Sequence, residues 1–135
     1  MANPRTLVLR LALVAVAAAV VVSVTAARAD QRACEEAGVA IYRNLASRDS
    51  VTGTKSARAT LLSDRCTDSR PLLASAAALV RTGHPRTAGP LARKAVRDEP
   101  ENPAAWYALA GTLEASDRAR AQAALRRARA LNPLS

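Results

Sequence analysis

The sequence predicts an all-α protein, and three observations lead to this prediction. Half of the residues are apolar, yet the chain has one Trp, two Tyr and no Phe, so alanine and leucine must form the core. Alanine is the strongest helix former, and β-branched residues are few after residue 51. Apolar residues also recur every three or four positions, which is the period of an amphipathic helix. A chain of 135 residues has room for one domain.

Residues 1–29 have the three parts of an export signal. The start contains Arg5 and Arg10 and no acidic residue, an apolar run follows from Leu11 to Ala27, and Ala27 to Ala29 is a small-x-small triplet. The apolar run also reaches the lower limit of length for a transmembrane helix. We therefore expect either a cleaved signal peptide or a membrane anchor.

The two alternatives stay open, but they agree on location. If the segment is retained, residues 7–27 cross the membrane, and the arginines before them stay on the cytoplasmic side. The protein is then membrane-anchored with its domain outside the cytoplasm. If the segment is removed, the protein is secreted.

Residues 30–67 are predicted to form a helical hairpin that caps the N-terminal end of the domain. We expect one helix over Asp30–Ser47 with Asp30 as its N-cap, a polar break over Arg48–Lys55 that includes Gly53, and a second helix over Ser56–Cys66. The expected buried faces are Cys34, Ala37, Ile41 and Leu45 on the first helix and Ala59, Leu62 and Cys66 on the second.

The two cysteines, Cys34 and Cys66, lie at equal distances in sequence from the expected turn near residue 50. An antiparallel hairpin would bring them together, and in an oxidising compartment such a pair forms a disulfide. Closing a loop of this size stabilises by roughly 3–4 kcal/mol. Two unpaired buried thiols are the alternative, since one pair without a nearby histidine is not a zinc site.

Residues 68–100 predict a second hairpin. Its first helix covers Asp68–Thr82, with Asp68 or Ser69 as the N-cap and Gly83 at the end. Pro85 and Pro90 then place the second helix at Ala88–Asp98 with Thr87 as N-cap, because a proline is tolerated only in the first turn. The predicted core residues are Leu72, Ala76, Leu79, Ala88, Ala92 and Ala95.

Residues 101–135 carry the clearest motif. It reads Trp106-x2-Leu109-Ala110-x2-Leu113, a polar break at Ser116-Asp117, then Ala121-x3-Leu125-x2-Ala128-x4-Pro133. This spacing resembles a tetratricopeptide repeat, with alanine and leucine at three positions where the family pattern has glycine, tyrosine and phenylalanine. Leu72 and Trp106 are one repeat length apart, so the resemblance extends back over the second hairpin. It implies a short right-handed solenoid of three hairpins that follow the N-terminal hydrophobic helix.

The resemblance also implies a function. Tetratricopeptide proteins are non-enzymatic scaffolds whose first helices line a concave groove for a partner's peptide or helix. Here the partner would be a protein of the bacterial cell envelope. The groove residues carried over are Arg70, Leu73, Ala77, Arg81, Tyr107, Gly111 and Glu114. The packing residues of the last repeat are Trp106, Leu109, Ala110, Leu113, Ala121, Leu125 and Ala128.

We find no pattern that indicates catalysis, a cofactor or a metal. The one histidine, His84, lies in an expected turn without a partner for a catalytic triad. Asp98, Glu99 and Glu101 are interpreted as residues that solvate a linker. The chain is therefore not expected to be an enzyme.

The formal charge of +9 has two explanations: the composition of a GC-rich genome, or selection for an anionic partner. The last helix contains Arg118, Arg120, Arg126, Arg127 and Arg129. We favour a solvated face with arginines that flank an alanine stripe. The alternative is a structural protein that sets this helix against anionic lipid or wall polymer. Nucleic acid is not expected, because no stacking aromatics are interleaved.

Overall fold

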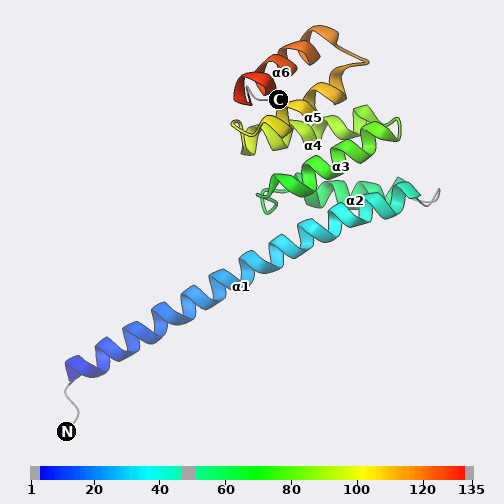
Figure 1. Ribbon diagram of the computed structural model, residues 1–135. Helices are drawn as coiled ribbons and strands as arrows, with labels where there is room; N and C mark the ends of the chain where they lie inside the picture. The colour runs from blue at the N-terminus through cyan, green and yellow to red at the C-terminus, as the bar shows by residue number, and fades with distance from the viewer. Residues whose placement is uncertain (1–3, 47–50, 133–135) are drawn as a thin grey trace.

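The structure is a computed structural model that describes residues 4–46 and 51–132. It consists of six helices: α1 (Pro4–Ala46), α2 (Val51–Leu62), α3 (Ser69–Arg81), α4 (Pro85–Asp98), α5 (Pro103–Leu113) and α6 (Arg118–Leu131). Figure 1 shows three hairpins stacked on one another, with the first part of α1 projecting from the stack as a long rod. The all-α prediction, with a hydrophobic helix ahead of the hairpins, is confirmed for the described residues.

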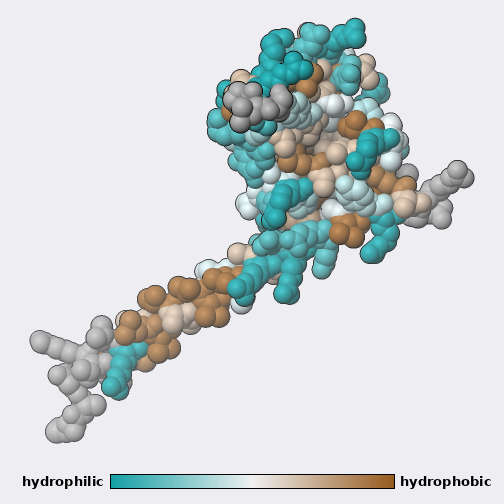
Figure 2. Space-filling model, in the orientation of Figure 1, coloured by the Kyte–Doolittle hydropathy of each residue, from teal (hydrophilic) through white to brown (hydrophobic). Residues whose placement is uncertain are grey.

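The projecting part of α1 is apolar and exposed. Its most apolar stretch has a mean hydropathy of 2.2 and is not covered by any other part of the structure, and α1 is the one helix in the described ranges with the length and composition to cross a membrane. Figure 2 shows this apolar band, which gives way to hydrophilic residues where α1 meets the hairpins. The segment could serve as a membrane anchor or as a signal sequence.

The expected separate helix from Asp30 does not exist. α1 continues without interruption through Asp30 to Ala46, so Asp30 lies inside the helix and is not an N-cap. The reason is local: no proline or glycine interrupts the segment between the apolar run and Gly38, and its alanines and arginines favour helix.

The second predicted helix is shifted toward the N-terminus. α2 begins at Val51 and ends at Leu62, so the predicted break is wrong for residues 51–55, while residues 47–50 lie outside the described ranges. Gly53 is tolerated in the first turn, where the backbone N–H groups have no helical partner in any case. Because the helix ends before Cys66, that cysteine does not mark the buried face of α2. Ala57 and Leu61 are buried, whereas Ala59 is exposed.

The predicted disulfide is present between Cys34 and Cys66, with the two Cα atoms 5.7 Å apart. Both residues are buried. The bridge joins the last third of α1 to the loop that leads into α3. It therefore fixes the first hairpin and sets α1 beside the second.

The ends of α3 follow the prediction closely. Asp68 is the N-cap, and its carboxylate accepts a hydrogen bond from the backbone N–H of Arg70. At the other end Gly83 adopts a φ of 81°, which glycine reaches without strain. The N–H of Gly83 donates to Val80 and that of His84 donates to Leu79, the paired bonds that close a helix at a left-handed glycine.

The start of α4 differs from the prediction. The helix begins at Pro85, with His84 at the N-cap position, so Thr87 lies within the helix and is not a cap. Proline is well suited to the first helical position because its φ is already helical and its missing N–H would be unpaired there. Pro90 consequently falls inside the helix and cannot donate to the carbonyl of Arg86. The packing of α4 between its neighbours must offset a cost of about 3 kcal/mol.

Alanine and leucine form the core of the stacked hairpins. Nine predicted core residues are buried, and four residues of the last repeat, Trp106, Leu109, Leu113 and Leu125, are half-buried instead. The buried nine are Leu72, Ala76, Leu79, Ala88, Ala92, Ala95, Ala110, Ala121 and Ala128. The Trp106 indole N–H donates to the carbonyl of Pro100 at 2.8 Å, so this side chain joins α5 to the loop that precedes it rather than filling the centre.

Gly38 lies at the contact between α1 and α3. A Cβ at this position would lie 3.4 Å from the Cβ of Pro71 and 3.7 Å from the Oγ of Ser75. Ser75 is fully buried, and its hydroxyl is the one buried side-chain polar atom among the described residues that lacks a hydrogen-bond partner. A buried hydroxyl without a partner costs free energy.

We predict that Ser75→Ala stabilises the protein. Removing the unpaired hydroxyl should raise the free energy of unfolding by about 1 kcal/mol beyond the gain in helix propensity. Ser56→Ala, at an exposed position of α2, is the matched control for propensity. Urea unfolding of the full chain in a nonionic detergent measures both. A Ser75→Ala protein less stable than the parent would contradict the prediction.

Candidate functional site: the open face of the first helices

The first helices of the second and third hairpins begin in the same way. Asn102 is the N-cap of α5, and its side chain accepts a hydrogen bond from the N–H of Ala104 at 3.0 Å. Asp68 does the same for α3, with Arg70 as the donor at 2.9 Å. Because the two caps occupy equivalent positions of successive repeats, α3 and α5 start in register.

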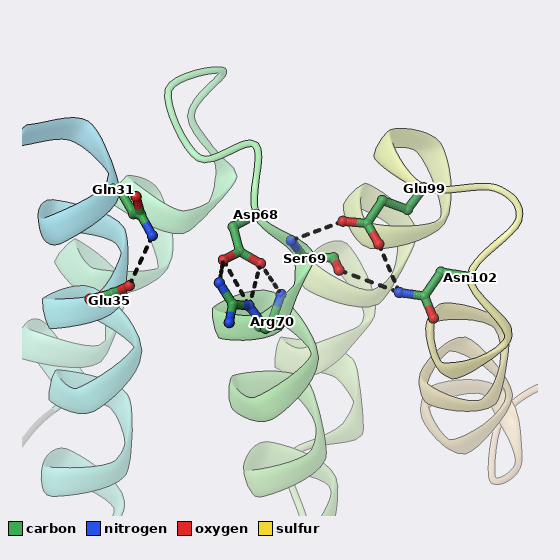
Figure 3. A network of polar contacts seen from close by, with 7 residues as sticks. All are labelled: Gln31, Glu35, Asp68, Ser69, Arg70, Glu99 and Asn102. Atoms are coloured by element: carbon green, nitrogen blue, oxygen red, sulfur yellow. Dashed lines mark hydrogen bonds and ion pairs between the residues drawn. The ribbon is translucent and has the colours of Figure 1, made fainter. Parts of the chain in front are cut away.

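Glu99 joins these two helix starts, as Figure 3 shows. One carboxylate oxygen accepts from the backbone N–H of Ser69 at 3.4 Å, and the other accepts from the side-chain amide of Asn102 at 2.7 Å. The same amide donates to the Ser69 hydroxyl at 3.4 Å. The hydrogen bond from Asn102, followed by that from Ser69, holds the pKa of Glu99 below its ordinary value, because both favour the ionised carboxylate.

The neighbouring acids also have structural partners. Asp98 pairs with Lys94 at 2.5 Å, and Glu101 pairs with Arg127 at 3.2 Å. Lys94 is almost fully buried, so Asp98 neutralises a charge that would otherwise be costly to cover. The interpretation as a solvated linker does not hold for Glu99, which connects the starts of α3 and α5. Glu101 is largely exposed and pairs with Arg127 of α6.

The exposed sides of α1, α3 and α5 together form a surface that we call the open face. On α3 it consists of Arg70, Ala74, Ala77 and Arg81, which recur every three or four residues and are all exposed. On α1 it consists of Glu35, Val39 and Tyr42, and at α5 it consists of Tyr107 and of Glu114, which follows the end of the helix.

A hollow of about 330 Å³ lies on the open face between α1 and α3. Val39 and Tyr42 line one side, and Pro71 and Ala74 line the other, with Arg70 at the rim. The Tyr42 hydroxyl donates to the carbonyl of Ala74 at 3.0 Å, so the ring bridges the two helices. Most of the exposed lining is apolar.

Arg70 is held in place at this rim. Two N–H groups of its guanidinium make three hydrogen bonds to the Asp68 carboxylate, with the closest contact at 2.6 Å. This hydrogen bonding lowers the pKa of Asp68 and raises that of Arg70, to which the charge of Asp68 adds. The guanidinium remains mostly exposed, so it can still contact a bound segment.

Most of the groove residues expected from sequence lie on the open face. Arg70, Ala77, Arg81, Tyr107 and Glu114 are exposed. Two others are placed differently. Leu73 is half-buried against the core. Gly111 is also half-buried, and a Cβ added to it would lie 4.0 Å from a methyl carbon of Val80. These two support the contact between α3 and α5.

Sequence reasoning missed the contribution of α1, namely Glu35, Val39 and Tyr42, and of Ala74 on α3. The sequence does contain a signal for the contribution of α1. Val39, Leu73 and Tyr107 are separated by equal steps of one repeat length, so extending the period of the last hairpin back to the first would have placed Val39 at the position of Tyr107. The degenerate pattern of the first hairpin concealed this.

The arginines of α6 are exposed, and two of them have acidic partners. Arg120 lies 3.2 Å from Asp117, the N-cap of α6, and Arg127 pairs with Glu101. Both ion pairs are largely exposed and contribute little to stability. They do, however, reduce the charge that α6 can offer to an anionic surface.

The described residues contain no group of acids, cysteines or histidines that could hold a metal ion. The Nδ1 of His84 contacts the hydroxyl of Thr82 at 3.2 Å in the turn between α3 and α4. This geometry fits a turn residue.

Comparison with known proteins agrees with the repeat pattern. Residues 69–112 match the family model of the tetratricopeptide repeat, which covers α3, α4 and nearly all of α5. This part of the chain is therefore a tetratricopeptide repeat, a class of helical repeat that typically serves as a non-enzymatic scaffold for protein–protein interaction. No curated protein and no solved structure matches the chain.

We predict that Glu99→Gln destabilises the protein in a pH-dependent way. Because the pKa of Glu99 is below its ordinary value of 4.5 in the folded state, its stabilisation is complete above pH 4.5 and is lost as the pH falls through the folded value. The variant should lose about 1 kcal/mol at pH 7, and this loss should shrink as the pH falls below 4.5 and through the folded pKa. Thermal unfolding across this range measures the difference.

Glu101→Gln is the control, since this neighbour makes an exposed ion pair. It should change the free energy of unfolding by less than about 0.5 kcal/mol. A loss for Glu99→Gln that does not shrink anywhere in the acid range would mean that the ionised carboxylate does not join the repeats.

Proposed function

We propose that this protein is a membrane-tethered scaffold that holds a peptide or a helix of an envelope protein against its open face. One observation carries the proposal. Beyond residue 30, the large apolar side chains that the described structure leaves exposed are Val39, Tyr42 and Tyr107, with exposed fractions of 55%, 43% and 38%. All three lie on the open face. Exposed apolar side chains gathered on one surface mark an interaction site.

The hollow between α1 and α3 supplies the anchoring part of this site. Its volume of about 330 Å³ is at the lower end for ligand pockets, which span roughly 300–1,000 Å³, so it suits one or two side chains of a docked segment. The apolar lining has a polar border, which consists of Glu35 and Arg70 at the hollow and of Arg81 and Glu114 farther along the open face. An apolar centre with a polar rim is the usual anatomy of a protein interface.

The tether is the apolar part of α1. We propose that it is retained, because α1 runs as one helix through Ala27–Ala29 and on to the disulfide at Cys34. Proteases act on segments that can open locally, and this one is held in a helix continuous with the folded hairpins. Retention would place the open face close to the surface of the membrane on the side away from the cytoplasm.

The open face predicts where a partner can be captured. A photoreactive residue in place of Val39 or Tyr107, in the full chain in its native membranes, should give one discrete cross-linked product. The same residue in place of Arg93, an exposed position on α4, is the control and should not give that product. With the photoreactive residue in place of Val39, the change Tyr107→Ala should lower the yield of the cross-linked product roughly tenfold or more, as expected for an interface aromatic.

Tyr42→Phe and Tyr42→Ala refine this test. The first removes only the hydrogen bond to Ala74 and keeps the ring, whereas the second empties one side of the hollow. We expect Tyr42→Phe to retain most of the cross-linking and Tyr42→Ala to lose it. Equal products from Arg93 and from the open-face positions would rule the proposal out.

Retention of α1 predicts the state of the N-terminus. N-terminal sequencing of the protein recovered from membranes should begin in the first residues of the chain, and the protein should resist alkaline carbonate extraction. A mature protein that begins at Asp30 and is found in the soluble fraction would show that the segment is a cleaved signal instead.

A further inference from the structure

The stacked hairpins have two ends that differ in charge. The near end is the one from which the apolar part of α1 departs, and it contains the starts of α3 and α5. The far end contains the turns at residues 82–84 and 114–117, which lie on the opposite side of the stack in Figure 1. Gly111 and Val80 are neighbours near these turns, so the two turns belong to one surface.

Acidic residues are concentrated at the near end. When each hairpin helix is divided at its midpoint, and α1 is counted from residue 30, the near half contains eight acidic and ten basic residues among those described. The acids are Asp30, Glu35, Glu36, Asp64, Asp68, Asp98, Glu99 and Glu101. Three of the four ion pairs described for the molecule lie at this end. The near end is therefore almost balanced in charge.

The far half has six basic residues and two acidic ones, Glu114 and Asp117. All six basic residues are exposed: Arg43, Lys55, Arg81, Arg86, Arg118 and Arg120. Asp117 is already paired with Arg120. A uniform bias toward arginine in the genome would raise the basic content of both ends, but it does not explain why the acids are so few at one of them.

The composition of the far end also indicates the class of its partner. The described turns consist of small or polar residues, namely Thr82, Gly83, His84, Glu114, Ala115, Ser116 and Asp117. A protein interface relies on a few buried apolar or aromatic anchors, and these turns offer none. Spread arginines without such anchors suit a flexible polymer whose many anionic groups are bound by charge alone.

We propose that the far end binds an anionic polymer with repeated phosphate or carboxylate groups, on the side of the domain that points away from the apolar part of α1. This surface meets the open face at Arg81 and Glu114, but the proposal does not depend on what the open face binds. Guanidinium groups recognise phosphate and carboxylate through paired N–H donors. The attraction should be multivalent and sensitive to salt.

The test uses the full chain in a nonionic detergent and long-chain polyphosphate as the probe. The far-end variant combines Arg81→Gln, Arg86→Gln and Arg118→Gln. The near-end control combines Arg65→Gln, Arg97→Gln and Arg129→Gln, which removes the same charge from exposed positions that are outside the described ion pairs. Circular dichroism and thermal unfolding establish that both variants fold.

At low salt we expect the far-end variant to bind polyphosphate at least roughly tenfold more weakly than the parent, and the near-end control to stay within about twofold. The slope of log affinity against log salt should become shallower by about two for the far-end variant alone, as expected when phosphate contacts are lost. Equal losses in both variants would mean that only net charge matters, and would overturn the proposal.

Two competitors test the class of partner. Vesicles of anionic lipid should compete less well than polyphosphate at equal phosphate concentration, and a short acidic peptide with an aromatic residue should compete only in proportion to its charge. Preferential binding of the vesicles, or of the peptide, would also overturn the proposal. Polyphosphate binding by the far-end variant that is as strong as that of the parent would also overturn the proposal.

Discussion

The Cys34–Cys66 disulfide is the constraint on which the arrangement of this molecule depends. α1 is a helix of 43 residues, of which only the last part contacts the hairpins. The bridge fixes one point of that part to the loop before α3, and its closure of a long loop stabilises the folded state by roughly 3–4 kcal/mol. For a core made mostly of alanine, with little apolar area per residue to bury, this is a substantial share of a typical stability.

From that fixed point the close approach of α1 and α3 follows. Gly38 faces Pro71 and Ser75, where an added Cβ would make ordinary van der Waals contacts, and Tyr42 reaches across to Ala74. The next step of the stack has an additional basis, because Glu99 and Asn102 connect α3 to α5 through polar groups beside the small-residue contact at Gly111. The open face is thus continuous over three helices although the polar contacts at its two junctions differ.

Much of this could be predicted from the sequence because it depends on local rules. Asp68 caps its own helix, Gly83 supplies a left-handed residue, and the spacing of leucines and alanines gives the period of the repeat. Each of these signals acts within a few residues, so one sequence is enough to read it. The disulfide was also predictable, since two cysteines placed symmetrically about a turn have few other options.

The rest depends on contacts or on the absence of a signal. The continuity of α1 through Asp30 was missed because a possible capping residue was given more weight than the lack of any helix breaker. The role of Glu99 could not be derived, because its partner Ser69 is thirty positions away and an acidic cluster beside prolines looks the same whether it is solvated or bonded. Val39 and Tyr42 were missed for a third reason: the first hairpin keeps the helical period but has lost the residues by which the repeat is recognised.

These differences change how the molecule is expected to act. A signal peptide joined to a separate domain would leave that domain free to turn, whereas one continuous helix holds it at a fixed angle to the apolar segment. The open face and the basic far end then point in defined directions relative to any membrane that α1 enters. The near end, where that helix departs, has a small net charge, so anionic lipid should attract this end only weakly. An upright domain keeps the hollow beside Tyr42 open to a protein segment and presents Arg81, Arg86 and Arg118 farther out.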